Sequence, residues 1–263
     1  MGWIEALILG IIQGLTEFLP VSSSGHLEIG KVILGVNAEK SLIFTVVVHG
    51  ATVLSTIIVF RKDILVLLKG LFAFKWNEET KYVAKLIVSM IPVAILGFTF
   101  ADEIQLLFNG NLLLVGSMLM VTAALLAFSH YAKQQEKEIS FGNSFVIGIA
   151  QALAVLPGIS RSGATISTGL LLHNKKEGIA KFSFLMVLVP IIAANLKDLM
   201  DGKLSENSGV SAIALIVGFF AAFISGLLAC KWMIGIVKKD KLIYFAIYCF
   251  VVGSFSISYY LFF

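Results

Sequence analysis

Apolar runs long enough to cross a membrane recur along most of this chain. A membrane-spanning helix needs about 20 predominantly apolar residues, and the segments that approach this length are 42–60, 82–100, 112–130, 180–196, 210–234 and 242–262. Charged residues gather between these runs, where a chain leaves the membrane. The pattern therefore predicts six transmembrane helices.

Two further apolar regions are each interrupted by a turn rich in proline, serine and glycine. Residues 10–26 read GIIQGLTEFLPVSSSGH and residues 148–165 read GIAQALAVLPGISRSGAT, so the same pattern returns about 138 positions later. The apolar runs beside each turn have only about 10–17 residues, which is short for a complete span and favours a re-entrant helix hairpin. One pocket built by the two turns is the natural inference.

The order of these elements is a hairpin, three spans, a hairpin and three spans. The chain therefore divides into repeat halves 1–131 and 139–263 within a single integral membrane domain, 1–263. An odd number of spans per half inverts the second half relative to the first. We predict an all-α polytopic membrane protein with six transmembrane helices and two re-entrant hairpins in an inverted-topology repeat, whose tips meet near mid-membrane.

Composition agrees with this class of protein. Hydrophobic residues make up 58% of the 263 residues and charged residues 14%, whereas a soluble domain has roughly 45–50% and about 25%. The net charge of +4 does not indicate a nucleic-acid partner, because the lysines lie at the ends of apolar segments. Cys230 and Cys249 lack metal-like spacing and are expected to pack as small apolar residues.

The distribution of basic residues orients the predicted helices. Cytoplasmic loops are enriched in Lys and Arg, which places inside the segments 61–81, 133–137, 175–181 and 238–241. The connections 101–111 and 200–209 carry few lysines and are expected outside. Both termini are then outside.

Glu17 is the most informative single residue. A carboxylate within an apolar run costs roughly 2.5–3.5 kcal/mol unless it is paired, neutralised or facing water. Gln13 lies four residues earlier, on the same face of a predicted helix. A functional role is the first interpretation, and the alternative is that the two side chains bond only to each other or to free backbone near the turn.

The turn after Glu17 has the features of an anion-binding site. Pro20 ends one helix and residues 22–25 can begin another, which leaves amide protons and hydroxyl groups at a helix N-terminus. Ser23 or a neighbour is a candidate nucleophile with His26 as its proton-transfer partner, because an unassisted hydroxyl is a weak nucleophile. Ordinary serine capping beside an interfacial histidine is the alternative.

The second turn contains a positively charged side chain, Arg161. Arg161 lies in an apolar neighbourhood, where a guanidinium needs an anionic partner, and its planar fork of donors matches phosphate geometry. A structural salt bridge to Glu17 is the alternative, and the two interpretations are compatible because a substrate or metal could separate the pair. His49, inside an apolar span, is interpreted as a hydrogen-bonded packing residue.

EFLPVSSSGH and LPGISRSGATIS together resemble the motifs of the undecaprenyl-diphosphate phosphatase family, the bacitracin-resistance phosphatases of bacterial envelopes. FSFLMVLVP at 182–190 is similar to the family's segment after its second motif. The resemblance implies hydrolysis of undecaprenyl diphosphate to the monophosphate and inorganic phosphate, at the outer face of the bacterial cytoplasmic membrane. This reaction recycles the lipid carrier for peptidoglycan synthesis and confers bacitracin resistance.

The resemblance also implies roles for individual residues. The catalytic residues would be Glu17, Ser23, His26 and Arg161. The substrate-binding residues would be Gln13, Ser22, Ser24, Gly25, Ser160, Ser162, Gly163 and Thr165. A divalent cation, Mg²⁺ or Ca²⁺, bridging Glu17 and diphosphate oxygens would suit oxygen-ligand chemistry. Many members have a glutamate where this chain has Thr45, so the first site holds fewer carboxylates here.

Some alternatives stay open at this point. Inverted repeats with broken helices are also typical of transporters, so a flippase of polyprenyl phosphate is the alternative function, although the Ser, His and Arg set favours an enzyme. Attack by Ser23 and attack by a water that Ser23 positions are both compatible with the motifs. The expected partners are the lipid substrate and the membrane, and the apolar surface is also compatible with a homodimer.

Overall fold

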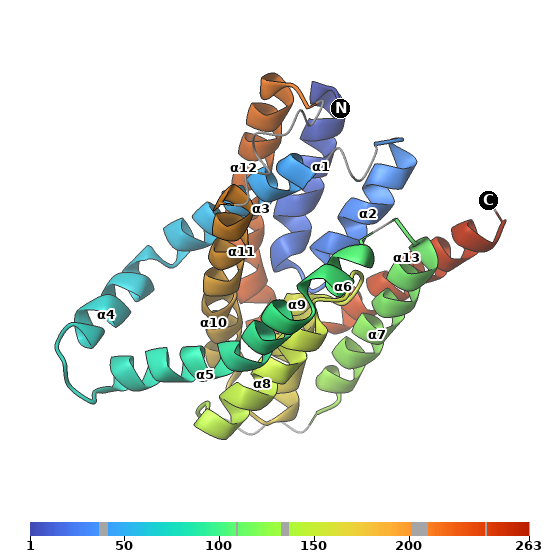
Figure 1. The fold of residues 1–263 in the computed structure, drawn as a ribbon. Coiled ribbons are helices and arrows are strands. Elements are labelled where there is room, and N and C mark those ends of the chain that lie inside the picture. The colour runs from blue at the N-terminus through green and yellow to red at the C-terminus, as the bar shows by residue number, and fades with distance from the viewer. Residues whose placement is uncertain (37–41, 109, 133–136, 201–209, 240, 263) are drawn as a thin grey trace.

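The protein is all-helical. A computed structural model describes residues 1–36, 42–108, 110–132, 137–200, 210–239 and 241–262 (Figure 1). The helices in these ranges are α1 Trp3–Phe18, α2 Ser23–Ile33, α3 Leu42–Val59, α4 Arg61–Leu71, α5 Glu78–Thr99, α6 Ala101–Leu106, α7 Leu112–His130, α8 Phe141–Leu153, α9 Arg161–Leu171, α10 Lys176–Met186, α11 Leu188–Met200, α12 Ala212–Lys238 and α13 Ile243–Phe262. Lys133 and residues 201–209, which entered the orientation argument, lie outside the described residues.

The described helices fit a multi-pass membrane protein. Five spans are long and apolar enough to cross a bilayer: α5, α7, α10 with α11, α12 and α13. A sixth is present if α3 and α4, which meet at an angle of 74°, count as one span. Each of the six predicted segments overlaps one of these spans, and the predicted bounds of the third, 112–130, are those of α7.

Two local features were not predicted from the apolar pattern. Helix α5 begins at Glu78, before its apolar run, because the Asn77 side chain accepts a hydrogen bond of 2.8 Å from the Thr80 amide and caps a polar first turn. The span at Lys176–Lys197 is divided at Val187 into α10 and α11. This division falls inside the turn that precedes Pro190, whose ring cannot donate to the Met186 carbonyl.

The helices that follow the two proline- and serine-rich turns have the same length and the same kind of cap. Helices α2 and α9 each contain 11 residues and begin 138 positions apart. Each is capped by a serine hydroxyl: Ser22 accepts from the Gly25 amide at 3.2 Å, and Ser160 accepts from the Gly163 amide at 3.0 Å. The sequence repeat is therefore also a repeat of the helix length and of the serine cap after each turn.

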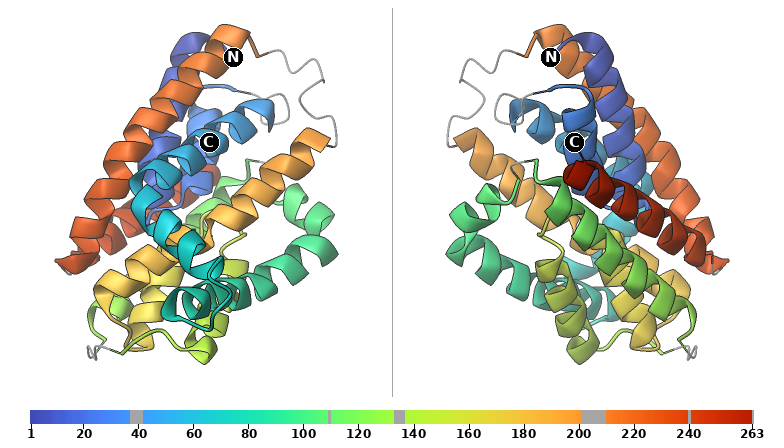
Figure 2. Two further views of the ribbon diagram at one scale, coloured as in Figure 1. Left: turned by 90° about the vertical axis from the view of Figure 1, so that its left-hand side faces the viewer. Right: turned by 90° about the vertical axis from the view of Figure 1, so that its right-hand side faces the viewer.

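The first helix of each hairpin packs on a long helix of the other half. Helix α1 lies along α12, and α8 lies along α5 (Figures 1 and 2). Both contacts depend on a glycine, since a Cβ atom at Gly10 would lie 2.6 Å from the Gly218 carbonyl oxygen, and one at Gly148 would lie 2.3 Å from that of Ser89. Small residues allow helix backbones to approach closely where no hydrophobic driving force acts between helices in a membrane.

Adding a methyl group at these contacts should destabilise the fold. In Gly10→Ala and Gly148→Ala the new Cβ would meet backbone atoms, and overpacking of this kind costs about 1–3 kcal/mol. We expect the melting temperature in detergent, measured by loss of the monodisperse chromatographic peak after heating, to fall by about 5 °C. The controls are Gly97→Ala and Gly235→Ala, where nothing lies within 4 Å of the new atom; equal shifts in all four variants would contradict the packing argument.

Candidate active site

The two serine turns touch each other. A Cβ atom at Gly25 would lie 3.1 Å from the Cα atom of Gly158. Gly158 has φ of +101°, a conformation that side-chain-bearing residues rarely adopt. The Ser162 hydroxyl donates to the Leu19 carbonyl at 3.2 Å, which links the second turn to the first. Residues 133 and 143 positions apart in the sequence thus meet in one polar centre.

Glu17 lies in the last turn of α1, beside this centre. Its carboxylate oxygen Oε2 accepts a hydrogen bond of 2.9 Å from the Gln13 side-chain amide, one helical turn away. The Gln13 side chain is fully buried and the Glu17 side chain is 10% exposed. Polar groups at this depth are retained only where hydrogen bonds compensate for lost hydration.

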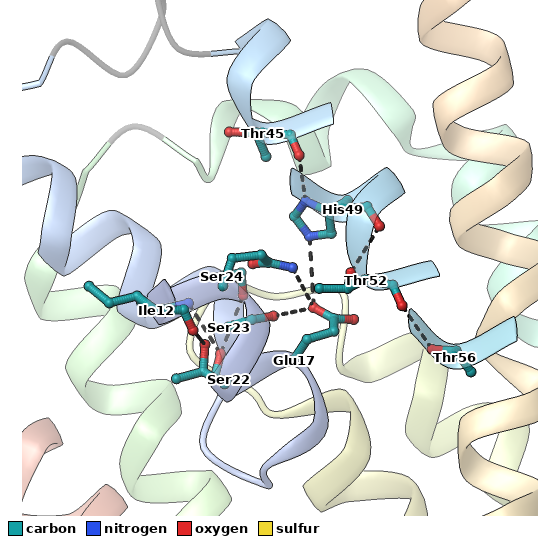
Figure 3. A network of polar contacts seen from close by, with 12 residues as sticks. Ile12, Glu17, Ser22, Ser23, Ser24, Thr45, His49, Thr52 and Thr56 are labelled. Atoms are coloured by element: carbon teal, nitrogen blue, oxygen red, sulfur yellow. Dashed lines mark hydrogen bonds and ion pairs between the residues drawn. The ribbon is translucent and has the colours of Figure 1, made fainter. Parts of the chain in front are cut away.

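Ser23 is the first residue of α2, and its hydroxyl points at Glu17 (Figure 3). Ser23 Oγ donates to the same oxygen, Glu17 Oε2, over 2.6 Å. This length is typical of a hydrogen bond between a hydroxyl and an ionised carboxylate. A hydroxyl bound to a base in this way is the general arrangement of an activated nucleophile.

His49 completes the surroundings of the carboxylate from α3. Its Nδ1 donates to the Thr45 carbonyl at 2.8 Å, and its Nε2 lies 3.9 Å from Glu17 Oε2 (Figure 3). The sequence interpretation of His49 as a packing residue missed this contact. The available signal was a lone histidine inside an apolar span, where ionisable residues commonly face a polar interior.

Arg161 lines a pocket together with Glu17. It is the first residue of α9, in the position that Ser23 occupies in α2. Glu17 and Arg161 both line the pocket, but no ion pair within 4.0 Å joins these two described residues. A direct salt bridge between them is therefore not formed.

Two buried polar atoms near the pocket lack hydrogen-bond partners. They are Arg161 Nη1, a donor, and Gln13 Oε1, an acceptor. Buried polar groups are nearly always satisfied, so each unpaired atom requires an explanation. A ligand that is anionic toward Arg161 and brings a donor or cation toward Gln13 would satisfy both.

The rest of the pocket lining contains both polar and apolar residues. The polar residues that line it besides Glu17 and Arg161 are Thr52, Thr56, Ser162 and Ser183. The apolar residues come mainly from α10, α11 and the residue between them, and they are Phe18, Val53, Phe184, Val187, Leu188 and Ile191. This mixed lining is the kind that suits a ligand with both charged and apolar parts.

The remaining predicted site residues cap helices or link neighbouring elements. The Ser22 and Ser160 hydroxyls cap helices and lie 3.3 Å from those of Ser24 and Ser162, respectively. The Thr165 hydroxyl lies 2.8 Å from the Arg161 carbonyl and 2.6 Å from the Ser183 hydroxyl, so it ties α9 to α10. Gly25 and Gly163 supply capped amides.

His26 lies apart from the Glu17 cluster. Its two ring nitrogens contact the Ser22 carbonyl and the Tyr248 hydroxyl, each at 2.9 Å. The Ser23 hydroxyl instead donates to Glu17, so the base beside Ser23 in this structure is the carboxylate.

The donor set fits a divalent cation only with help from a ligand. Within the described parts of the chain, no group of three or more His, Cys, Asp and Glu residues is placed to hold a metal ion. Glu17 and the unpaired Gln13 Oε1 offer two oxygen donors. This agrees with the way Mg²⁺ is commonly held, by one or two carboxylates with water and substrate phosphates.

Comparison with known proteins agrees with this geometry. The family model described as bacitracin resistance protein BacA matches residues 6–255. A protein of Parabacteroides distasonis named undecaprenyl-diphosphatase is 57% identical over 261 residues, covering 98% of both chains. Proteins with the same name from Bacteroides fragilis and Desulfatibacillum aliphaticivorans are 57% and 37% identical, over 98% and 97% of both chains. The chain therefore belongs to the bacitracin resistance protein BacA family.

Proposed function

We propose that this chain hydrolyses undecaprenyl diphosphate to undecaprenyl phosphate and inorganic phosphate. Full-length relatives named undecaprenyl-diphosphatase support the reaction. The observation that carries it within the structure is the Ser23–Glu17 hydrogen bond at a pocket that Glu17 and Arg161 both line, where Arg161 Nη1 has no hydrogen-bond partner. The product returns a lipid carrier to cell-wall synthesis, and the same activity confers bacitracin resistance.

In the proposed complex, the diphosphate of the substrate lies between the two serine turns. The unpaired Nη1 of Arg161 would donate to phosphoryl oxygens. Helices α2 and α9 both begin at these turns, and helix N-termini favour anions. The first prenyl units would lie against the apolar residues Phe184, Val187 and Ile191 of the pocket lining. This orientation puts the terminal phosphorus beside Ser23.

In the proposed reaction Ser23 is the nucleophile and Glu17 is the base. The Ser23 oxygen forms a bond to the terminal phosphorus, the phosphorus bond to the bridging oxygen breaks, and undecaprenyl phosphate leaves. The hydroxyl proton passes to Glu17 Oε2, which already accepts that hydrogen bond. Water then hydrolyses the phosphoserine, which releases inorganic phosphate and restores Ser23. Arg161 stabilises the charge on the phosphoryl oxygens in both steps.

A divalent cation, Mg²⁺ or Ca²⁺, is proposed as the cofactor. Glu17 and Gln13 Oε1 are the residues that would hold it. When bound, the ion would neutralise negative charge on the diphosphate.

We also propose the inverted-topology repeat, with re-entrant hairpins α1–α2 and α8–α9 in a single domain. The matching caps of α2 and α9 support it, as do the packing of α1 on α12 and of α8 on α5. The basic segments 61–81 and 238–241 would then lie on the cytoplasmic side, and the active site would open toward the extracytoplasmic side.

Removing the nucleophile or the base should abolish turnover. In Ser23→Ala and Glu17→Gln we expect kcat to fall at least about 1,000-fold, because each change removes a group that acts in bond formation. The measurement is phosphate released from a polyprenyl diphosphate by protein purified in detergent, which stops transport but permits hydrolysis. The controls are Ser117→Ala, whose hydroxyl bonds only within its own helix, and the exposed Glu103→Gln. Parental turnover in Ser23→Ala would disprove the nucleophile.

Replacing Arg161 should lower the activity even when the new residue is lysine. Lysine keeps the charge but lacks the planar fork that binds two phosphoryl oxygens. We expect kcat/KM to fall about 100-fold in Arg161→Lys and further in Arg161→Ala. The matched control is Arg61→Lys, where the parent guanidinium only donates to the Ile58 carbonyl in an exposed position. An unchanged KM and kcat in Arg161→Ala would remove the arginine from the site.

The proposed cation makes activity dependent on added metal. We expect EDTA to suppress phosphate release and Mg²⁺ or Ca²⁺ in excess to restore it. Gln13→Ala should raise the metal concentration needed for half-maximal activity, since it removes one of the two protein oxygens. Full activity in EDTA would show that no dissociable cation takes part.

A further inference from the structure

The turn that carries Ser23 has an unusual backbone conformation. Ser22, the residue immediately before it, has φ of +69° and ψ of 96°. A positive φ is uncommon for residues other than glycine, and such conformations persist only when the surroundings enforce them. The equivalent residue of the second turn, Ser160, has an ordinary φ of −72°. The first turn is therefore strained where its repeat counterpart is not.

His26 supplies contacts that hold Ser22 in this conformation. The Ser22 carbonyl accepts the backbone amide of His26 at 3.1 Å and the His26 ring nitrogen Nδ1 at 2.9 Å. A carbonyl can only accept, so Nδ1 must carry a proton. The residue equivalent to His26 in the unstrained second turn is Ala164, which has no such donor.

Tyr248 of α13 holds the ring of His26 in turn. With Nδ1 protonated, Nε2 of the neutral ring is an acceptor, and it lies 2.9 Å from the Tyr248 hydroxyl. The two rings are also stacked, with centroids 5.5 Å apart and an interplanar angle of 10°. The hydrogen bond and the stacking together determine both the tautomer and the orientation of the imidazole.

We infer that Tyr248 and His26 are positioning residues, which hold Ser22 in its strained conformation and thereby aim the Ser23 hydroxyl at Glu17. The chain of contacts runs from α13 through the imidazole to the carbonyl directly before Ser23. Both ring nitrogens are engaged, so His26 acts on Ser23 through the backbone. The inference rests on the proposed phosphatase reaction, because it assigns these residues to the geometry of that reaction.

The tautomer can be observed without measuring activity. In protein labelled with ¹⁵N-histidine, we expect the His26 ring to show a protonated Nδ1 and an unprotonated Nε2, and Tyr248→Phe to change the Nε2 shift. The chain has four histidines, so His26→Asn assigns the signal. A parent ring with its proton on Nε2 alone would overturn the inference, whatever the activity of the protein.

Kinetics test whether the contacts position the nucleophile. Tyr248→Phe removes one hydroxyl and keeps the ring, so we expect kcat to fall about tenfold while KM stays within about twofold. Tyr244→Phe is the control, one turn earlier on α13 and 65% exposed. Parental kcat in Tyr248→Phe would refute the role of Tyr248. A parent that releases no phosphate would instead disprove the proposed function.

A conservative replacement separates positioning from proton transfer by His26. Asparagine places an N–H near the position of Nδ1 but cannot carry a proton through the reaction. We expect His26→Asn to keep about tenfold more kcat than His26→Ala, because the Ser22 carbonyl retains its donor. Equal inactivity of the two variants, with melting temperatures near that of the parent, would identify His26 as a proton carrier and overturn the inference.

Discussion

The buried carboxylate of Glu17 is the constraint on which the rest of this structure depends. A charge inside an apolar bundle costs several kcal/mol unless donors surround it. Here the donors come from separate elements: Gln13 from α1 and Ser23 from α2, with His49 of α3 nearby. Compensating the charge therefore brings the start of α2 and the middle of α3 to the end of α1. The contacts that make the charge tolerable also assemble a nucleophile beside a base.

Two broken helices in an apolar chain create a second requirement, because their exposed backbone groups need partners that lipid cannot supply. Serine caps satisfy amides in each turn, and the Ser162 hydroxyl satisfies the Leu19 carbonyl of the other turn. The close approach of Gly25 and Gly158 permits this exchange. The turns therefore shield each other, and what stays unpaired between them, Arg161 Nη1 and Gln13 Oε1, is available to a ligand.

The two turns are similar in sequence but differ in the residues that the proposed reaction uses. At equivalent positions, α2 begins with Ser23 and α9 begins with Arg161, the residues to which the proposed reaction assigns the nucleophile and the phosphate-binding cation. The backbone differs in the same way, since Ser22 is strained and Ser160 is not. Two similar turns thus form an asymmetric site, and the positive φ lies directly before Ser23.

The sequence by itself determined what depends on local spacing. Apolar run length located the spans, and the interval of four residues placed Gln13 beside Glu17, as the hydrogen bond confirms. Only the tertiary structure decided which distant residues meet. It brought His49 to Glu17, turned His26 toward Tyr248, and kept Arg161 from pairing directly with the carboxylate. Helix periodicity relates residues within a turn or two, whereas these contacts depend on how whole helices pack.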